Sequence, residues 1–273
     1  MKRIFFAVLA FAVLISVSSA YGWNSAGHCT IGHIADQHLT PKARKMCDKY
    51  LGHSLAYYAS WMDQWRYSKE YHHTARWHAV GIKDGKLIPA ELVGDISIFR
   101  APLTDDEHGV ARMEQMLDAL KDYRKMSDSA VVVNLKCLIH MVGDMHCPMH
   151  AGRLSDRGGN DTKVKWFGEK TSMHSVWDSK MIESARRWGY QEWVEQLDRK
   201  DKKFIKEITK GTYEEWFMQT VSNAARFYEY VESMPGHNPN LSYKFVFDFS
   251  PTLEECLILG GYRLAYVRNT IFG

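Results

Sequence analysis

The segment from Cys137 to His150, CLIHMVGDMHCPMH, constrains the fold of this chain more than any other stretch. Three histidines and an aspartate interrupt an apolar run there, and ionisable side chains in apolar surroundings are costly unless they have partners. In a helix, His140 and Asp144 lie four residues apart on one face, and Pro148 ends the helix so that His150 can turn back toward that face. The segment therefore predicts a buried ligand arrangement.

A second pair of the same kind, His174 and Asp178, follows downstream. Imidazole with carboxylate is a ligand set that suits divalent zinc, and two pairs indicate more than one metal ion. One isolated pair would more simply be an ion pair on a helix surface or a hydrogen-bonded core histidine. That simpler interpretation does not explain why, of 13 histidines, only His237 lies beyond Asp178.

The N-terminus predicts export. Two basic residues precede an apolar run from Ile4 to Val17, and small residues follow, which is typical of a secretory signal peptide and not of a spanning helix. Cleavage after Ala20 or after Gly22 is compatible with this pattern, and only the second leaves Trp23 as the first residue. We therefore expect a secreted or periplasmic protein without a membrane anchor.

With residues 1–22 assigned to the signal peptide, residues 23–273 predict a single mainly α domain. Apolar residues make up 45% of the sequence, enough for a sizeable core, and no linker rich in Pro, Gly or Ser interrupts the chain. The expected architecture is a multi-helix bundle with a small β-hairpin.

The helices are predicted from apolar spacing and from cap signals. Apolar residues recur at helical spacing in three regions: Asp106 to Met126, Thr212 to Tyr230 and Leu253 to Ile271. Thr40-Pro41 and Ser250-Pro251 each resemble an N-cap followed by proline at the first helical position. The alternating residues from Lys163 to Phe167 predict the hairpin.

The charge balance does not predict a basic surface for nucleic acid. Without Lys2 and Arg3 the chain has 33 basic and 32 acidic side chains, a net charge of +1. A polyanion can still bind where metal ions supply positive charge locally.

The cysteines number five, an odd count that leaves at least one unpaired: Cys29, Cys47, Cys137, Cys147 and Cys256. Export permits disulfides, but their connectivity cannot be derived from one sequence. Cys29 and Cys147 lie beside histidines, yet they are weak candidates for zinc ligands because neither has Cys-x-x-Cys spacing. A disulfide or a small buried apolar role is the better expectation for each.

Several motifs, in order, resemble those of the zinc-dependent single-strand-specific nucleases of fungi, plants and bacteria, the S1/P1 type. The resemblance extends from Trp23 to Asp178, and the region beyond it is similar only in being helical. The motifs are Trp23-Asn-Ser-Ala-Gly-His28, Ala59 to Arg66, Trp77-His78, Leu138 to His150, Asp156 to Asp161, and His174 to Asp178.

The resemblance implies three zinc ions and assigns their ligands. One ion would be held by Asp63, His78, His140 and Asp144. A second would be held by His150, His174 and Asp178. The third would be held by His28, by Asp144 as a bridge, and by the amine and carbonyl oxygen of Trp23. Cleavage after Gly22 then matters, because only that cut frees the amine of Trp23.

The implied function is an endonuclease that hydrolyses single-stranded DNA and RNA through a metal-activated water and leaves 5′-phosphate ends. Cleavage of 3′-nucleotides is a further implied activity. Asp63 would orient the water, and Arg66 would neutralise the transition state, unless Arg66 is a solvated arginine on a helix surface. Asn160 would contact substrate or only shape the Gly158-Gly159 turn. We expect a monomer whose partner is the nucleic-acid substrate.

Two positions depart from the family pattern. Ala79 and Gly81 stand where the family has an aromatic residue and a carboxylate that help to clamp a base, so base recognition is expected to be weakened or built elsewhere. Four indoles could stack on bases or simply fill the core: Trp61, Trp65, Trp166 and Trp177. For His146 we expect a core or ligand-supporting role.

Two alternative functions stay open. The first is a zinc-dependent phospholipase C of the same superfamily, which is disfavoured because that branch is expected to carry glutamate where Asp178 stands. The second is a non-catalytic exported metal-binding helical module, which the complete ligand set together with Arg66 disfavours.

Overall fold

The computed structural model describes residues 23–83, 86–89 and 108–273, and helices account for most of them. The predicted mainly α fold is confirmed, while the predicted signal peptide lies outside the described residues. The helices are α1 (Ser25–Gln37), α2 (Pro41–Leu51), α3 (Leu55–Tyr58), α4 (Trp61–Trp65), α5 (Gly109–Lys121), α6 (Asp128–Asp144), α7 (Met173–Ser175), α8 (Met181–Ala185), α9 (Tyr190–Leu197), α10 (Lys202–Ile208), α11 (Tyr213–Ser233) and α12 (Tyr243–Phe272).

Short helical turns connect these helices. The 3-10 turns are η1 (His72–Trp77), η3 (Tyr123–Lys125), η4 (Pro148–Ala151) and η5 (Leu154–Asp156), and η6 (Val176–Lys180) is a π-helical turn. The helix predicted between Asp106 and Met126 is therefore α5 followed by η3, and residues 106–107 lie outside the described part of the chain.

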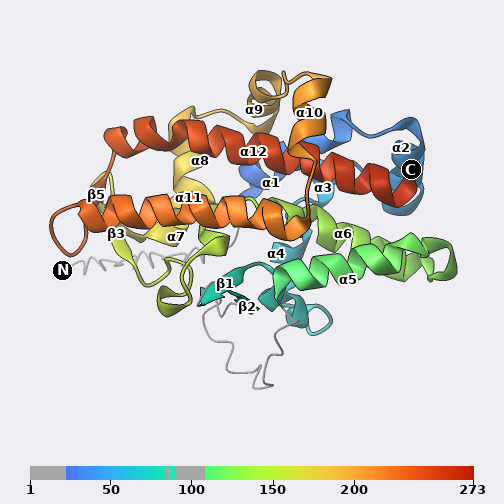
Figure 1. Ribbon diagram of the computed structural model, residues 1–273, viewed down its shortest axis with the longest axis horizontal. Helices are drawn as coiled ribbons and strands as arrows, with labels where there is room; N and C mark the ends of the chain where they lie inside the picture. Colours follow the sequence, from blue (N-terminus) through green and yellow to red (C-terminus); the bar gives the residue numbers. More distant parts are fainter. Residues whose placement is uncertain (1–22, 84–85, 90–107) are drawn as a thin grey trace, which may run out of the picture.

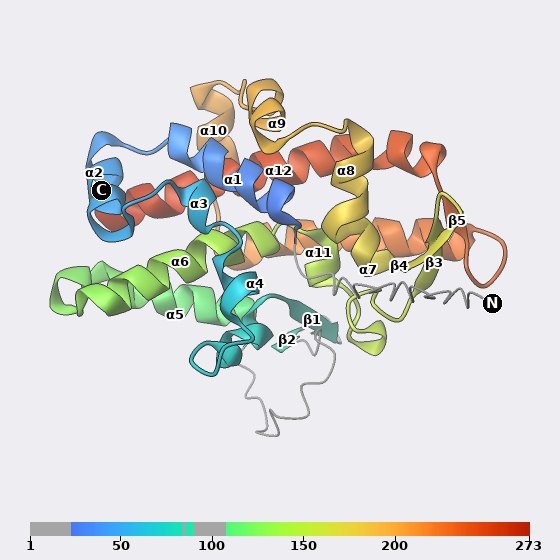
Figure 2. The same cartoon turned by 180° about the vertical axis from the view of Figure 1, so that it is seen from behind.

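The two longest helices, α11 and α12, run lengthwise through the molecule in opposite directions (Figures 1 and 2). Aromatic rings join them, with the ring centroids of Phe227 and Phe249 4.6 Å apart. On another side of α12, α1 packs closely: a side chain at Gly261 would place its Cβ 2.5 Å from Ile34. Glycine at this position therefore allows α1, which carries His28, to lie directly on the core helix.

Side-chain caps explain where several helices begin. The Thr40 hydroxyl accepts a hydrogen bond from the Ala43 amide at 3.2 Å, with Pro41 at the first helical position, as predicted. At the start of α11, Thr212 and Glu215 form a reciprocal capping box.

The prediction that Ser250-Pro251 begins a helix is wrong. Pro251 lies inside α12, which starts at Tyr243 and continues unbroken to Phe272. Proline removes the backbone hydrogen bond that residue 251 would donate to the Phe247 carbonyl, but buried residues on both sides of Pro251 hold the helix in the core.

The predicted hairpin is present as β3 (Lys163–Trp166) and β4 (Glu169–Ser172), paired antiparallel. Its two-residue turn, Phe167-Gly168, has φ of 50° and 91°, values that match the twist of a tight hairpin. Strand β5 (Asn240–Leu241) adds to β3 in parallel. A second hairpin, β1 (Val80–Lys83) with β2 (Lys86–Pro89), was not predicted.

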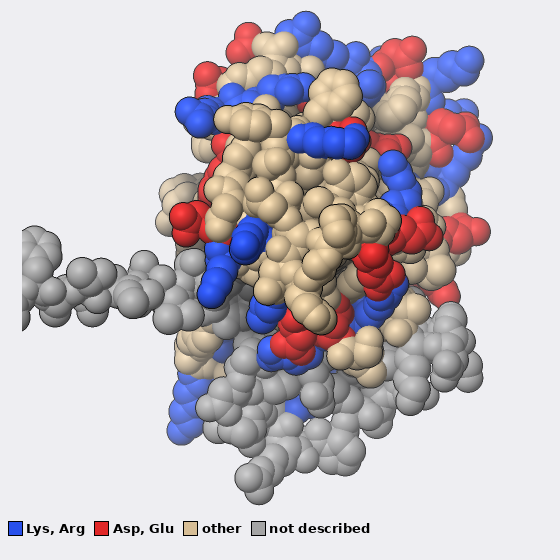
Figure 3. All heavy atoms as spheres, turned by 90° about the vertical axis from the view of Figure 1, so that its left-hand side faces the viewer, with Lys and Arg blue, Asp and Glu red and all other residues tan. Residues whose placement is uncertain are grey.

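Strands β3, β4 and β5 and the adjoining ends of α11 and α12 form the end of the molecule that faces the viewer in Figure 3. Uncharged side chains cover its centre, and basic and acidic side chains both lie around it. Exposed aromatic residues in this region are Phe167, Tyr243 and Phe247. Within the described residues, no helix is long and apolar enough to cross a bilayer.

Candidate metal centre

The predicted ligand side chains converge on one buried cluster, although they come from distant parts of the chain. Asp63 is 20% exposed, and the other side chains of the cluster are almost fully buried. The contributing elements are α1 (His28), α4 (Asp63), the end of η1 (His78), α6 (His140 and Asp144), η4 (His150), α7 (His174) and η6 (Asp178).

The carboxylate of Asp144 lies at the centre of the cluster. Its Oδ2 is 3.0 Å from Nδ1 of His78 and 3.0 Å from Nε2 of His140. Its Oδ1 is 3.3 Å from Nε2 of His28 and 3.4 Å from Nδ1 of His150. Because different histidines face its two oxygens, Asp144 is placed as a bridge between neighbouring groups of ligands.

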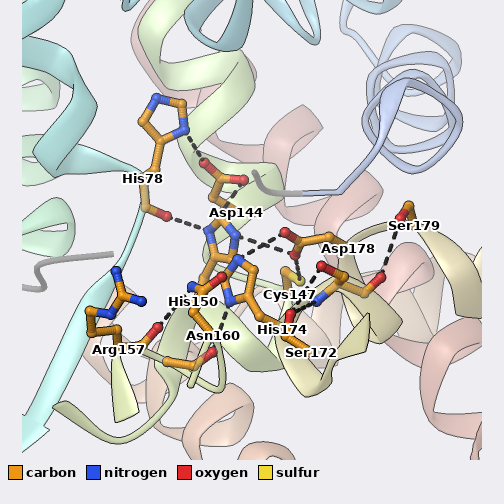
Figure 4. Close-up of polar contacts among 12 residues, drawn as sticks. His78, Asp144, Cys147, His150, Arg157, Asn160, Ser172, His174, Asp178 and Ser179 are labelled. Carbon is orange, nitrogen blue, oxygen red and sulfur yellow. Dashed lines mark hydrogen bonds and ion pairs between the residues drawn. The ribbon is translucent and has the colours of Figure 1, made fainter. Parts of the chain in front are cut away.

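A second set of contacts lies on the other side of His150 (Figure 4). The Nε2 of His174 is 2.8 Å from Oδ2 of Asp178, and the Nε2 of His150 is 3.5 Å from Oδ1 of Asp178. His174 and Asp178 are four residues apart, as predicted, but the intervening backbone is π-helical. The sulfur of Cys147 also lies here, 3.4 Å from Oδ1 of Asp178.

Backbone carbonyl oxygens orient three of the imidazoles. The Nδ1 atoms of His140, His150 and His174 lie 2.7, 2.5 and 2.8 Å from the carbonyl oxygens of Ala59, His78 and Gly158. An N–H at Nδ1 leaves the lone pair of Nε2 for another partner, which is the usual arrangement around a metal-ligating histidine. These carbonyls were not predicted from the sequence, because their roles depend on tertiary contacts.

The arrangement fits a metal centre. Several buried polar atoms that face the cluster have no hydrogen-bond partner among the described residues, including Nε2 of His28 and His150, both carboxylate oxygens of Asp144, and Oδ2 of Asp178. Unpartnered buried polar atoms are costly, and a shared cation would satisfy them together. Three groups have ligand atoms close enough to hold an ion: His28 with His140 and Asp144; Asp63 with His78 and His140; and Cys147 with His150 and Asp178.

The electrostatics of the site favour the metal-binding protonation states of two histidines and two carboxyl groups. For His150, by contrast, burial is outweighed by Asp144 and Asp178, which raise its pKa to about 9, so His150 must lose a proton when a metal binds. Burial lowers the pKa of His28 to about 4 and that of His78 to about 3, so both rings are neutral at pH 7. Burial alone would raise the pKa of Asp144 and Asp178, but the neighbouring imidazoles outweigh it and keep both carboxyl groups below their usual range. Neutral imidazoles and ionised carboxylates are the forms that bind divalent metals.

Arg66 is buried beside Asp63, contrary to the alternative of a solvated surface arginine. Its Nη1 is 3.3 Å from Oδ1 of Asp63, three residues earlier. Burial raises the pKa of Asp63 to about 6. The phenolic oxygen of Tyr67, whose side chain is 65% exposed, lies 3.4 Å from Nη2 of Arg66. Tyr67 was not predicted as a site residue, although its position next to Arg66 in the sequence was a signal that could have identified it.

The start of α1 lies beside Asp178, because the amide of Asn24 donates to the Asp178 carbonyl oxygen at 2.5 Å. Trp23, the preceding residue, is fully buried. The side-chain amide of Asn160 donates to the Arg157 carbonyl at 2.9 Å and so shapes the turn that orients His174.

The remaining candidates lie away from the ligand atoms or fill the core. His146 bonds the Val142 carbonyl through Nδ1 and Arg263 through Nε2, which is a core role. Trp61, Trp166 and Trp177 are buried, and Trp65 is 48% exposed. Ala79 is also buried. None of the five cysteines forms a disulfide.

Comparisons with known proteins agree with this site. Residues 23–273 match the family described as S1/P1 Nuclease. The chain is 25% identical to Endonuclease 1 of Arabidopsis thaliana, covering 97% of this chain and 92% of that protein. It is 24% identical to Nuclease S1 of Aspergillus oryzae, covering 93% of each. It is 27% identical to Nuclease P1 of Penicillium citrinum over 58% of each chain. The chain thus belongs to the S1/P1 nuclease family, whose members hydrolyse nucleic acids.

Proposed function

We propose that this chain is an exported zinc endonuclease that hydrolyses single-stranded DNA and RNA, leaves 5′-phosphate ends, and also acts on 3′-nucleotides. The observation that carries the proposal is the convergence of the predicted imidazole and carboxylate ligands around Asp144. Family membership supports the nucleic-acid substrate, and the three candidate ligand groups support the metal centre.

Zinc would be held by the ligands that the resemblance assigns, with Asp144 shared between ions. When bound, zinc supplies an activated water and neutralises charge on the phosphoryl oxygens. This explains how a chain with a net charge near zero can act on a polyanion, because the positive charge is concentrated at the site.

Asp63 and Arg66 would assist the reaction directly. Asp63 is the most exposed of the ligand side chains, so its carboxylate can accept a hydrogen bond from the attacking water and orient it. The guanidinium of Arg66, fixed beside Asp63, can bind a phosphate oxygen as negative charge develops.

Substrate contacts would lie near Asp63, the ligand side chain that is 20% exposed. Asn160 is a candidate substrate contact, although its amide is already used in its own turn. The exposed rings of Trp65 and Tyr67 flank Arg66 and offer surfaces on which unpaired bases can stack. They would compensate in part for Ala79, which cannot stack.

The third zinc requires the free amine of Trp23, and hence signal-peptide cleavage after Gly22. The hydrogen bond from Asn24 to the Asp178 carbonyl supports this requirement, because it places the start of the mature chain beside the ligands. Export by the signal peptide also implies a secreted or periplasmic location, and we propose that the mature enzyme acts as a monomer.

One paired experiment tests the proposal. The protein beginning at Trp23, and a matched protein with one extra glycine before Trp23, are assayed for zinc content and for hydrolysis of single-stranded DNA, RNA and phosphatidylcholine. We expect about three zinc ions per chain, the number that the family resemblance implies, with nucleic acid cleaved. The extra glycine should remove about one ion, because an amide replaces the amine. Cleavage of lipid alone would favour the phospholipase alternative, and zinc binding without any hydrolysis would favour the non-catalytic module.

A further inference from the structure

Cys147 lies in the cluster of candidate ligands, although its spacing in the sequence made it a weak candidate for a zinc ligand. It lies in the turn between α6 and η4 and is fully buried. Its sulfur is 3.4 Å from Oδ1 of Asp178, and it shares a candidate ligand group with His150 and Asp178. The other cysteines of the chain, all within the described residues, belong to no such group.

The backbone explains why this thiol points into the site. The amide of Cys147 donates to the Asp144 carbonyl at 2.9 Å, and the Cys147 carbonyl accepts from the amide of His150 at 3.0 Å. Cys147 is the N-cap of the 3-10 turn η4, and its own backbone is extended, with φ of −89° and ψ of 118°. In Figure 4 the Cys147 sulfur lies beside the carboxylate of Asp178, on which His150 and His174 also converge.

The separations match those around a single ion. Donor atoms of a tetrahedral zinc site lie about 3.3 to 3.8 Å apart, given metal–ligand bonds of about 2.0 to 2.3 Å. The distances from Oδ1 of Asp178 to the Cys147 sulfur and to Nε2 of His150 are 3.4 and 3.5 Å. A hydrogen bond alone would leave the sulfur with a single polar partner and would not explain why three donor atoms converge.

A second observation also points to an ion at this place. Nε2 of His150 and Oδ2 of Asp178 are buried and have no hydrogen-bond partner among the described residues. A thiol that donates to Oδ1 of Asp178 satisfies neither atom, whereas a cation bound by Cys147, His150 and Asp178 satisfies both.

We propose that Cys147 is a fourth protein ligand, through its thiolate, of the metal ion held by His150, His174 and Asp178. The inference rests on the proposed metal centre. When the ion binds, the thiol proton leaves to solvent and a sulfur–metal bond forms, with no change in oxidation state. A thiolate makes this position more selective for zinc and other thiophilic metals than an oxygen and nitrogen set alone.

The test uses the mature protein loaded with cobalt(II), because a cobalt–thiolate bond gives an intense near-ultraviolet charge-transfer band. The band should be present in the unmodified protein and in the control Cys256→Ala, whose buried cysteine is remote from the ligand groups. It should be lost in Cys147→Ser. The affinity for one ion should also fall by about 10- to 100-fold, the range seen when a residue that hydrogen-bonds a metal ligand is replaced.

Each outcome separates the two proposals. Cobalt bound without the band, in a protein that still cleaves nucleic acid, would overturn the Cys147 ligand and leave the nuclease proposal intact. No cobalt bound and no hydrolysis would overturn the metal centre itself. If Cys147→Ser fails to fold, X-ray absorption on the zinc-loaded unmodified protein decides: a sulfur neighbour at about 2.3 Å supports the ligand, and its absence contradicts it.

Discussion

At the scale of single residues, the geometry of the cluster depends on the backbone atoms that orient its side chains as well as on the side chains themselves. Backbone carbonyls orient three of the imidazoles, and His28 is confined by the backbone of α6 instead. A Cβ at Gly143 would lie 2.7 Å from Nδ1 of His28, closer than side chains and rings approach in folded proteins. Glycine between the ligands of α6 is therefore what allows His28 to reach Asp144.

We predict that Gly143→Ala displaces the His28 ring. Affinity for the ion that His28 holds should fall about 10- to 100-fold, and overpacking should cost about 1–3 kcal/mol of stability. Zinc titration and urea denaturation measure the two effects. Gly189→Ala is the matched control, because a Cβ there meets its nearest neighbour at 3.5 Å. Unchanged zinc affinity in Gly143→Ala would show that His28 is not confined in this way.

The convergence of the candidate ligand side chains could be predicted in part from the sequence, because the spacing within each pair is local. His140 with Asp144, and His174 with Asp178, lie on one helical face whatever the rest of the fold does. Cys147 was ranked low because the rule applied to it concerned spacing between cysteines, whereas its partner Asp178 lies 31 residues away. Contacts of that kind depend on tertiary structure, and one sequence does not reveal them.

At the scale of elements, α11 and α12 hold the end of α6 in place. The Thr220 hydroxyl donates to the Met145 carbonyl at 2.7 Å. Arg263 of α12 is buried and donates to Nε2 of His146 at 3.1 Å, to Gln219 at 2.7 Å, and to the Ile208 carbonyl at 3.0 Å. Burial, with Arg263 nearby, lowers the pKa of His146 to about 3, so its neutral ring can accept this hydrogen bond.

We predict that Arg263→Met destabilises the protein by about 3 kcal/mol, because it leaves Nε2 of the buried His146 without its donor and removes two part-buried hydrogen bonds, at about 1–3 kcal/mol for the first and about 1 kcal/mol for each of the others. Urea denaturation of the zinc-loaded protein measures the change. The control is Arg226→Met, an exposed arginine on α11, which should stay within about 0.5 kcal/mol of the unmodified protein. Equal stability of the two variants would mean that the Arg263 contacts contribute nothing.

The start of a helix could be predicted where a cap hydrogen bond closes locally. The prediction was wrong where tertiary packing outweighs the local cap signal. Thr40-Pro41 begins α2 as expected, since the cap hydrogen bond closes within three residues. The same signature at Ser250-Pro251 is overridden, because residues before and after Pro251 are buried against neighbouring helices. Hairpin β1–β2 was not predicted, although the dipeptide between its strands in the sequence, Asp84-Gly85, is typical of a two-residue hairpin turn.

At the scale of the whole molecule, the cluster connects segments far apart in the chain. His28 and Asp178 lie far apart in the sequence, yet two contacts connect them in the fold. His28 lies 3.3 Å from Asp144, and His150 lies 3.4 Å from Asp144 and 3.5 Å from Asp178. Without a cation, several buried polar atoms there have no hydrogen-bond partner among the described residues. The metal ions should therefore stabilise the fold as well as supply the chemistry.

We predict that removing zinc with a chelator lowers the melting temperature, and that the difference between the loaded and metal-free forms widens from pH 6.5 to pH 9. Burial alone would lower the pKa of His150, but Asp144 and Asp178 raise it to about 9 in the metal-free fold. That proton stabilises the metal-free fold fully below pH 6.5, and its contribution is lost as the pH rises through about 9. The loaded form holds a metal ion in place of the proton and does not lose this contribution.

Scanning calorimetry at fixed free zinc measures the difference in melting temperature. The control is His53→Gln, which replaces an exposed histidine and should behave like the unmodified protein. A difference that is constant or narrows with rising pH would show that zinc does not displace the proton of His150.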